Sequence, residues 1–173
     1  MLEENPIPFL TRLKELIFDY LLILVYLVCL AIVCLSFYFF FYGRIPVFTM
    51  LQSQLIATVT SVLPIVGIFS WMDSRGGSWG KKRAGLIVRY TKNPIQSALI
   101  RNSIKFLPWQ IGHMGTIAGI YSSYTSIFGH ICAITSLMLL LTLLLMATNR
   151  KDKRHFGDLL AGSQVVLKRL VQP

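Results

Sequence analysis

Three long stretches without a charged side chain constrain what this chain can fold into. Tyr20–Tyr42 covers 23 residues, Ile45–Met72 covers 28, and Phe106–Asn149 covers 44. As helices, the first two would be about 35 and 42 Å long, and about 20 apolar residues suffice to cross a bilayer. The first and the second stretch are therefore each predicted to cross a membrane once. Pro64 and Gly67 predict a local kink inside the second crossing.

The third stretch would be about 66 Å long as a helix, which is twice the length that one crossing needs. Two crossings joined by a turn at Gly119–Ser126 account for this length. The first of them contains Pro108, Gln110 and His113, which allow it to be tilted or re-entrant. The predicted fold is thus all-α and integral to the membrane, with four transmembrane helices. Their approximate ranges are 16–42, 49–72, 106–122 and 126–148.

Composition supports a lipid environment for one domain that spans residues 1–173. Hydrophobic residues make up 54% of the chain and charged residues 14%, well below the quarter that is usual in soluble proteins. Cys29, Cys34 and Cys132 all lie in apolar stretches, where they are expected to be small buried hydrophobic residues. No metal site and no cofactor are predicted.

Basic residues are distributed unevenly among the connecting segments. Segments 1–15, 73–105 and 149–173 contain two, eight and six Lys or Arg residues, whereas the opposite connections contain only Arg44. The positive-inside rule then places both termini and the 73–105 segment in the cytoplasm, in a cell membrane. A three-helix protein would place one strongly basic segment outside. The net charge of +10 also favours anionic lipid head groups, and nucleic-acid binding is not expected.

The cytoplasmic segments contain short extended motifs. Ala84–Tyr90 and Ser163–Arg169 are rich in β-branched residues and are bounded by glycine or charge, which is typical of strands. They are predicted to pair as a small β-ribbon that packs against the helix ends. The segment Asn93–Trp109 predicts an amphipathic interfacial helix with Asn93 as its cap and Pro94 in its first turn.

Four short blocks follow one another along the chain: RLKELIFD (12–19), GSWGKKRAGLIV (77–88), RNSIK (101–105) and DLLAGSQVV (158–166). Together they resemble the RDD family of multi-pass membrane proteins, which is named after one Arg and two Asp. The matching positions are Arg12, Asp19 and Asp158. The second block is similar to the family's Gly-Thr-x-Gly-Lys-x3-Gly-x-x-Val pattern, with Ser78 in place of Thr.

The resemblance covers nearly the whole chain and implies a membrane domain for transport of small solutes or ions, or for cation/proton exchange. The other motif residues that it implies, including a basic layer, are Gly77, Gly80, Lys81, Gly85, Arg101, Asn102 and Lys105. One departure concerns Gly157, which stands where the family often has His directly before the second Asp. The nearest histidine is His155, so a role for an adjacent His–Asp pair does not carry over.

The segment Gly76–Val88 looks like a phosphate-binding loop, but its spacing excludes one. A P-loop has four residues between its first Gly and its Gly-Lys pair, followed by Ser or Thr. Here three residues separate Gly76 from Gly80, and Lys82 follows Lys81. The glycines are instead expected to form a tight turn, and Lys81 to hold the loop at the lipid surface.

Asp19 is the leading candidate for a functional charge, because it lies about one turn inside the first apolar stretch. Arg12 is two helical turns earlier, about 10 Å away, so Asp19 is expected to meet Lys81, Arg101 or Lys105. The pairing is either a structural lock for the first helix or a proton or cation site. The alternative for Arg101 and Lys105 is extension toward lipid head groups.

Three further polar residues are candidates. Asp158 is expected to cap a turn, bind backbone amides or pair with basic residues. His113 and His130 lie in the last two crossings and serve either as proton relays or in hydrogen bonds within the bundle. Gly115 and Gly119 lie four residues apart and predict close helix packing within the chain.

Two classes of function are left. No nucleophile with an adjacent base appears, so an enzyme is not expected. The first class is a small transporter or cation/proton exchange component, in which a homo-oligomer could enclose the pathway. The second is a non-catalytic accessory subunit that docks onto a larger membrane complex.

Overall fold

The computed structural model describes residues 7–170; the ends of the predicted cytoplasmic segments, 1–6 and 171–173, lie outside the described residues. Its longer helices are α1 (Phe9–Tyr42), α5 (Pro94–Tyr121), α6 (Ile127–Asn149) and a continuous helix formed by α2 (Met50–Ala57), η1 (Thr58–Val62) and α3 (Leu63–Ser74). The shorter elements are α4 (Trp79–Arg83), β1 (Leu86–Tyr90), α7 (Phe156–Ala161), β2 (Ser163–Leu167) and η2 (Lys168–Leu170).

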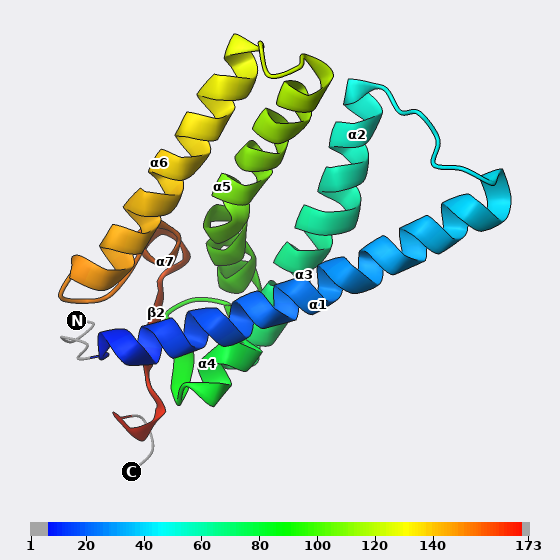
Figure 1. The fold of residues 1–173 in the computed structure, drawn as a ribbon. Coiled ribbons are helices and arrows are strands. Elements are labelled where there is room, and N and C mark those ends of the chain that lie inside the picture. The colour runs from blue at the N-terminus through cyan, green and yellow to red at the C-terminus, as the bar shows by residue number, and fades with distance from the viewer. Residues whose placement is uncertain (1–6, 171–173) are drawn as a thin grey trace.

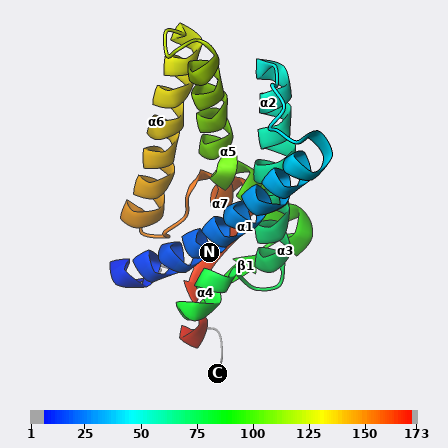
Figure 2. The same cartoon turned by 45° about the vertical axis from the view of Figure 1, so that its right-hand side comes forward.

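The longer helices form an open bundle. α6, α5 and α2–α3 stand side by side, and α1 runs obliquely past one end of them (Figure 1; Figure 2). We call this end, which carries α4, α7 and both strands, the base. The loops 43–49 and 122–126 lie at the opposite end (Figure 1).

Three helices within residues 7–170 are long and apolar enough to cross a membrane: α1, the continuous α2–α3 helix and α6. Their apolar side chains point outward: no residue in the most apolar window of α1 is buried, and 11% of that window in α6 is. Phe40, for example, is 84% exposed. Contiguous apolar surface of this extent needs lipid or another apolar partner to cover it. The structure thus contains candidate membrane-spanning helices at three of the predicted crossings, with α1 beginning seven residues earlier than position 16.

α5 differs from its prediction. The predicted interfacial helix and the third crossing at 106–122 form one helix from Pro94 to Tyr121, with Asn93 accepting hydrogen bonds as its cap. The charges that seemed to separate the two segments are satisfied by other elements, so no break is needed. α5 is not among the three strongly apolar helices of the described residues, because its polar side chains lower its hydropathy.

The second crossing is irregular directly before its proline. A π-helical turn occupies Thr58–Val62, and Pro64 follows it. Pro64 has no N–H to donate to the carbonyl of Thr60 four residues earlier. The hydroxyl of Tyr26 on α1 donates to that carbonyl instead, at 2.6 Å. The helix therefore continues through the proline, and α1 is tied to it at this point.

The predicted β-ribbon is confirmed. β1 and β2 pair antiparallel, with Leu86 opposite Leu167 and Val88 opposite Val165. These four side chains are buried and form a small core together with Ile7. Gly85 precedes β1 with a φ of +69°, in the left-handed region that glycine adopts easily.

The contact between α5 and α6 depends on glycine. A Cβ at Gly115 would lie 3.0 Å from the backbone nitrogen of Ala133 and 3.0 Å from the carbonyl oxygen of Gly129. The predicted close packing at Gly115 is therefore a contact within the chain, as expected for small residues between membrane helices.

We predict that Gly115→Ala destabilises the protein by about 1–3 kcal/mol, because backbone atoms of α6 cannot yield to the added methyl group. Thermal unfolding in detergent measures this loss. Gly67→Ala is the matched control, since a Cβ there meets nothing within 4 Å among the described residues. Equal melting temperatures for both variants would contradict the prediction.

Candidate functional site

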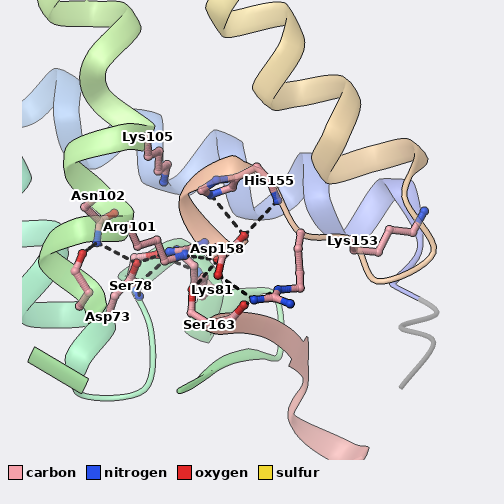
Figure 3. A network of polar contacts seen from close by, with 12 residues as sticks. Asp73, Ser78, Lys81, Arg101, Asn102, Lys105, Lys153, His155, Asp158 and Ser163 are labelled. Atoms are coloured by element: carbon pink, nitrogen blue, oxygen red, sulfur yellow. Dashed lines mark hydrogen bonds and ion pairs between the residues drawn. The ribbon is translucent and has the colours of Figure 1, made fainter. Parts of the chain in front are cut away.

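Four carboxylates are buried together at the base. Glu15 and Asp19 come from α1, Asp73 from α3 and Asp158 from α7, and each is at most 5% exposed. The whole chain contains only seven Asp and Glu residues, so more than half of them meet here. Lys81 from α4 and Arg101 and Lys105 from α5 lie among them (Figure 3). We call this set, with Arg12, the charge network.

Lys81 is at the centre of the charge network. Its Nζ lies 3.1 Å from Asp73 Oδ1, 3.3 Å from Glu15 Oε1 and 3.8 Å from Asp19 Oδ2. Burial opposes its positive charge, but Asp73 and Glu15 outweigh burial and raise the pKa of Lys81. The prediction that Lys81 lies at the lipid surface is wrong, because its side chain is fully buried. The following residue, Lys82, is exposed.

The glycine-rich block brings α4 against α1. Ser78 Oγ donates to Asp19 Oδ2 at 2.8 Å, and the backbone N–H of Gly80 donates to Asp19 Oδ1 at 2.9 Å. A Cβ at Gly80 would lie 2.3 Å from the carbonyl oxygen of Glu15, so only glycine allows this approach. Lys105 adds its charge, with Nζ 3.6 Å from Asp19. Gly77 lies in the tight turn before α4 with a φ of +148°.

Arg101 bridges two carboxylates. Its Nη1 donates to Asp73 Oδ2 at 2.5 Å and its Nε to Asp158 Oδ1 at 2.6 Å. Asn102 Nδ2 donates to the same Asp73 oxygen at 3.2 Å. The alternative that Arg101 extends toward lipid head groups is wrong, because it is only 3% exposed, and its carboxylate partners are Asp73 and Asp158 in place of the expected Asp19. Lys105 is intermediate: its side chain is 24% exposed, and its ammonium group lies 4.9 Å from the ring centroid of Phe69.

Asp158 is held by its neighbours on and around α7. It accepts hydrogen bonds from Ser163 Oγ at 2.8 Å and from the backbone N–H of His155 at 3.3 Å. Burial opposes its charge, but Arg101 and these donors outweigh burial and lower the pKa of Asp158 to about 2. Asp158 is therefore ionised at neutral pH.

His155 lies beside Asp158 in the folded chain, although the position directly before Asp158, where the family often has His, is occupied by Gly157. Its Nε2 lies 3.3 Å from Asp158 Oδ2. A Cβ at Gly157 would lie 2.8 Å from His155 Cε1 and 2.9 Å from the carbonyl oxygen of Arg101, so a side chain does not fit there. Burial, reinforced by Arg101, lowers the pKa of His155 to about 4 against the attraction of Asp158. The imidazole is neutral at pH 7, and its contact with Asp158 is not an ion pair.

Arg12 lies at the edge of the charge network. Its Nη1 is 3.0 Å from Glu15 Oε2, and its Nη2 donates to the carbonyl of Lys153 at 3.3 Å. The network then balances: Glu15, Asp19, Asp73 and Asp158 contribute −4, and Arg12, Lys81, Arg101 and Lys105 contribute +4. Within the part of the chain that the structure describes, no negative charge is left over to hold an added cation at this site.

The two histidines of the predicted crossings lie apart from this site. His113 is two turns beyond Lys105 on α5 and packs against Trp109 with ring centroids 5.5 Å apart. Its Nε2 is buried without a hydrogen-bond partner in residues 7–170. His130 is exposed on α6. The structure does not bring the two imidazoles into the charge network.

Sequence reasoning missed Glu15 and Asp73. Glu15 lies three residues after Arg12 and four before Asp19, which places all three on one helix face. Asp73 directly follows the second uncharged stretch. The signal that could have identified both residues is the scarcity of acids, seven against 17 basic residues. A carboxylate near the bilayer needs a cation, so each of these few acids was a candidate for an ion pair.

The charge network can bind or exchange little while it is intact. Within residues 7–170, no group of three or more His, Cys, Asp and Glu side chains is placed to hold a metal ion. The carboxylates are engaged by cations and by backbone or hydroxyl donors. The arrangement holds α1, α3, α4, α5 and α7 together.

A comparison with models of known protein families gives one match. A family model described as RDD family matches residues 8–162. No curated protein and no solved structure matches the chain significantly.

We predict that Lys81→Met destabilises the protein by about 3–5 kcal/mol, because three buried carboxylates lose their central cation. Lys82→Met changes the same residue type on the exposed side of α4 and is the control. Denaturant unfolding of both variants in detergent micelles compares them. A loss no larger for Lys81→Met than for Lys82→Met would contradict the prediction.

We also predict that stability falls as the pH is lowered from 6.5 toward 4.5. The pKa of His155 is about 4 in the folded protein, whereas that of an unperturbed histidine is 6.5, so the unfolded chain binds the extra proton in this range. The loss is about 2 kcal/mol, and the stability that Asp158 contributes is lost only at lower pH. Melting temperatures across this range should depend less on pH in His155→Gln than in His130→Gln. Equal pH dependence in both variants would refute the assignment.

Proposed function

The chain belongs to the RDD family of membrane proteins, and on that premise we propose that it crosses a cell membrane four times and acts as a small transport component. The substrate class that we propose is small solutes or ions, with cation/proton exchange as the reaction. Both termini and the base lie in the cytoplasm.

The fourth crossing in this proposal is α5. α5 runs antiparallel to the α2–α3 helix, and polar contacts join the two along their length. Gln54 Nε2 donates to the carbonyl of Met114 at 3.1 Å, and Gln110 Nε2 donates to Thr58 Oγ1 at 3.0 Å. Ser70 Oγ donates to the carbonyl of Ala98 at 3.3 Å. If α2–α3 crosses the bilayer, these contacts carry α5 across beside it, with its polar groups turned away from lipid.

The proposed orientation rests on the uneven distribution of basic residues. Lys82, Arg83, Arg89 and Lys92 are exposed at the base. The opposite end carries only Arg44 in its two loops. A base with this charge favours the cytoplasmic face and its anionic lipid head groups.

A seam of uncharged polar side chains between α2–η1 and α5 is the observation that carries the transport proposal. It consists of Gln54, Thr58, Gln110 and His113, and the buried atoms Gln54 Oε1 and His113 Nε2 lack hydrogen-bond partners among the described residues. Gln110 is five residues beyond Lys105, so the seam lies about 8 Å or more from the charge network along α5. Polar side chains inside membrane-spanning helices are costly to bury and mark solute pathways. π-Turns such as η1 are also frequent at functional sites.

Because of this seam, we propose its polar side chains, and not Asp19, as the transport site. Ser78, Gly80 and Lys105 engage both carboxylate oxygens of Asp19, which suits the structural interpretation of this residue. Four helices make a thin wall around a pathway, so we propose that the chain works as a homo-oligomer.

A second candidate function is an accessory subunit that docks onto a larger membrane protein. The observation that favours it is the outer half of α1, from Val28 to Tyr42. It diverges from the other helices (Figure 1), and the buried residues of α1 are Glu15 and Asp19 alone. An apolar helix that separates from its own bundle can pack against another protein.

Cysteine labelling tests the topology. In a chain whose three native cysteines are replaced by serine, we expect a membrane-impermeant maleimide to label Ser123→Cys in intact cells. Lys92→Cys should react only after the membrane is permeabilised, because it lies at the base. Labelling of Lys92→Cys in intact cells would rule out the proposed orientation.

Proteoliposomes containing a pH-sensitive dye test transport. We expect sodium, lithium or potassium gradients to drive proton flux, and Gln110→Leu to lower the flux about tenfold through the loss of the Thr58 contact. Thr142→Val is the control, since this exposed hydroxyl donates to the carbonyl of Met138 in its own helix.

Two results would sink the exchange proposal: no flux under any of the three gradients, or equal flux in Gln110→Leu and Thr142→Val. Recovery of a stoichiometric partner from native membranes, combined with absence of flux, would support the accessory function instead.

A further inference from the structure

Three polar side chains at the junction of β1, α5 and α7 have buried atoms without a hydrogen-bond partner in the described part of the chain. They are the hydroxyl of Tyr90, Oδ1 of Asn102 and both ring nitrogens of His155. Asn102 is 0% exposed and His155 is 8% exposed. Buried polar atoms in native proteins are nearly always hydrogen-bonded to protein or to ordered water, so these three side chains need an explanation.

Asn102 and His155 contact the carboxylates that Arg101 bridges, and Tyr90 lies opposite Ser163, whose hydroxyl donates to Asp158. Asn102 Nδ2 is 3.2 Å from Asp73, and His155 Nε2 is 3.3 Å from Asp158. Arg101 lies between these two carboxylates (Figure 3). Burial, together with the negative charges of Asp73 and Asp158, raises the pKa of Tyr90, so its hydroxyl keeps its proton and can both donate and accept.

The unpaired atom of Asn102 is not a matter of amide orientation. Asn102 Nδ2 donates to Asp73 Oδ2 and to the carbonyl of Ala98 at 3.0 Å, and both of these atoms are acceptors. Turning the amide around would place Oδ1 against these two oxygens. The amide oxygen therefore stays on the other side, where it needs a donor.

We propose that the Arg101 junction binds ordered water between β1, α5 and α7. Tyr90, Asn102 and neutral His155 together offer donors and acceptors in the number that a buried water uses. The ligand is neutral because the charge network already balances at −4 and +4. On the Gly157 side of His155 there is no room for a larger ligand, because even a methyl group on Gly157 would meet His155 Cε1 at 2.8 Å.

This site is independent of the proposed transport function. Bound water would complete the hydrogen bonding of three side chains that border the charge network on the side of the β-ribbon. It would also couple Tyr90 to Asn102 and His155, side chains that come from β1, from α5 and from the start of α7.

The direction in which one substitution changes the melting temperature tests the proposal. Tyr90→Phe removes a single hydroxyl oxygen. If water binds this oxygen in the wild-type protein, the melting temperature of the variant falls by several degrees. Tyr26→Phe should show a similar fall, because the hydroxyl of Tyr26 donates to the carbonyl of Thr60. Tyr124→Phe, at an exposed tyrosine, should leave the melting temperature unchanged. An unchanged or raised melting temperature in Tyr90→Phe overturns the proposal, because removing a truly unpaired hydroxyl is neutral or stabilising.

Radiolytic hydroxyl labelling of the wild-type chain in oxygen-18 water gives a second test that does not depend on a variant folding. Hydroxyl radicals formed from bound water modify the side chains next to it. We expect Tyr90 and His155 to take up the label and the buried aromatic Phe69, which is 1% exposed in an apolar cluster, to stay unlabelled. Labelling of Tyr90 and His155 no greater than that of Phe69 also overturns the proposal.

Discussion

The base of this protein depends on the neutralisation of four carboxylates buried beside an apolar bundle. A buried charge is tolerated only when it is paired and hydrogen-bonded, and breaking one pair leaves its partner uncompensated. Lys81 and Arg101 provide the central positive charges, and each contacts acids from more than one helix. The buried side chains of α1 are Glu15 and Asp19, so this helix is anchored mainly by charge and only partly by apolar packing.

Away from the base, the polar contacts change in kind. Along the seam between α2–η1 and α5 they are made by amides, hydroxyls and backbone carbonyls without formal charge. α5 takes part in both regions: Arg101 and Lys105 join the charge network, and Gln110 joins the seam. This double role explains why α5 is less apolar than its neighbours and still lies between α6 and α2–α3 (Figure 1).

The differences between expectation and structure have one common cause. Lys81 was expected to hold its loop at the lipid surface or to meet Asp19, and Arg101 was expected to meet Asp19 or to reach lipid head groups, as basic residues near membrane helices usually do. The acids that hold them inside, Glu15 and Asp73, lie in other segments, and nothing local marks them as partners. The same holds for His155: the sequence departure at Gly157 separated it from Asp158, and the first turn of α7 brought the two within 3.3 Å.

The sequence by itself determined the apolar helices, the two strands of the β-ribbon and the uneven distribution of basic residues. These features depend on local composition and on the period of apolar residues along a segment. Only the tertiary structure decided which cation meets which carboxylate, that α5 is one helix, and that the glycine-rich block packs α4 against α1. Those outcomes depend on contacts such as Asp19 with Gly80 and Arg101 with Asp158, which join residues 61 and 57 positions apart. Pairing over such separations is set by the burial of the whole assembly and not by the properties of any one segment.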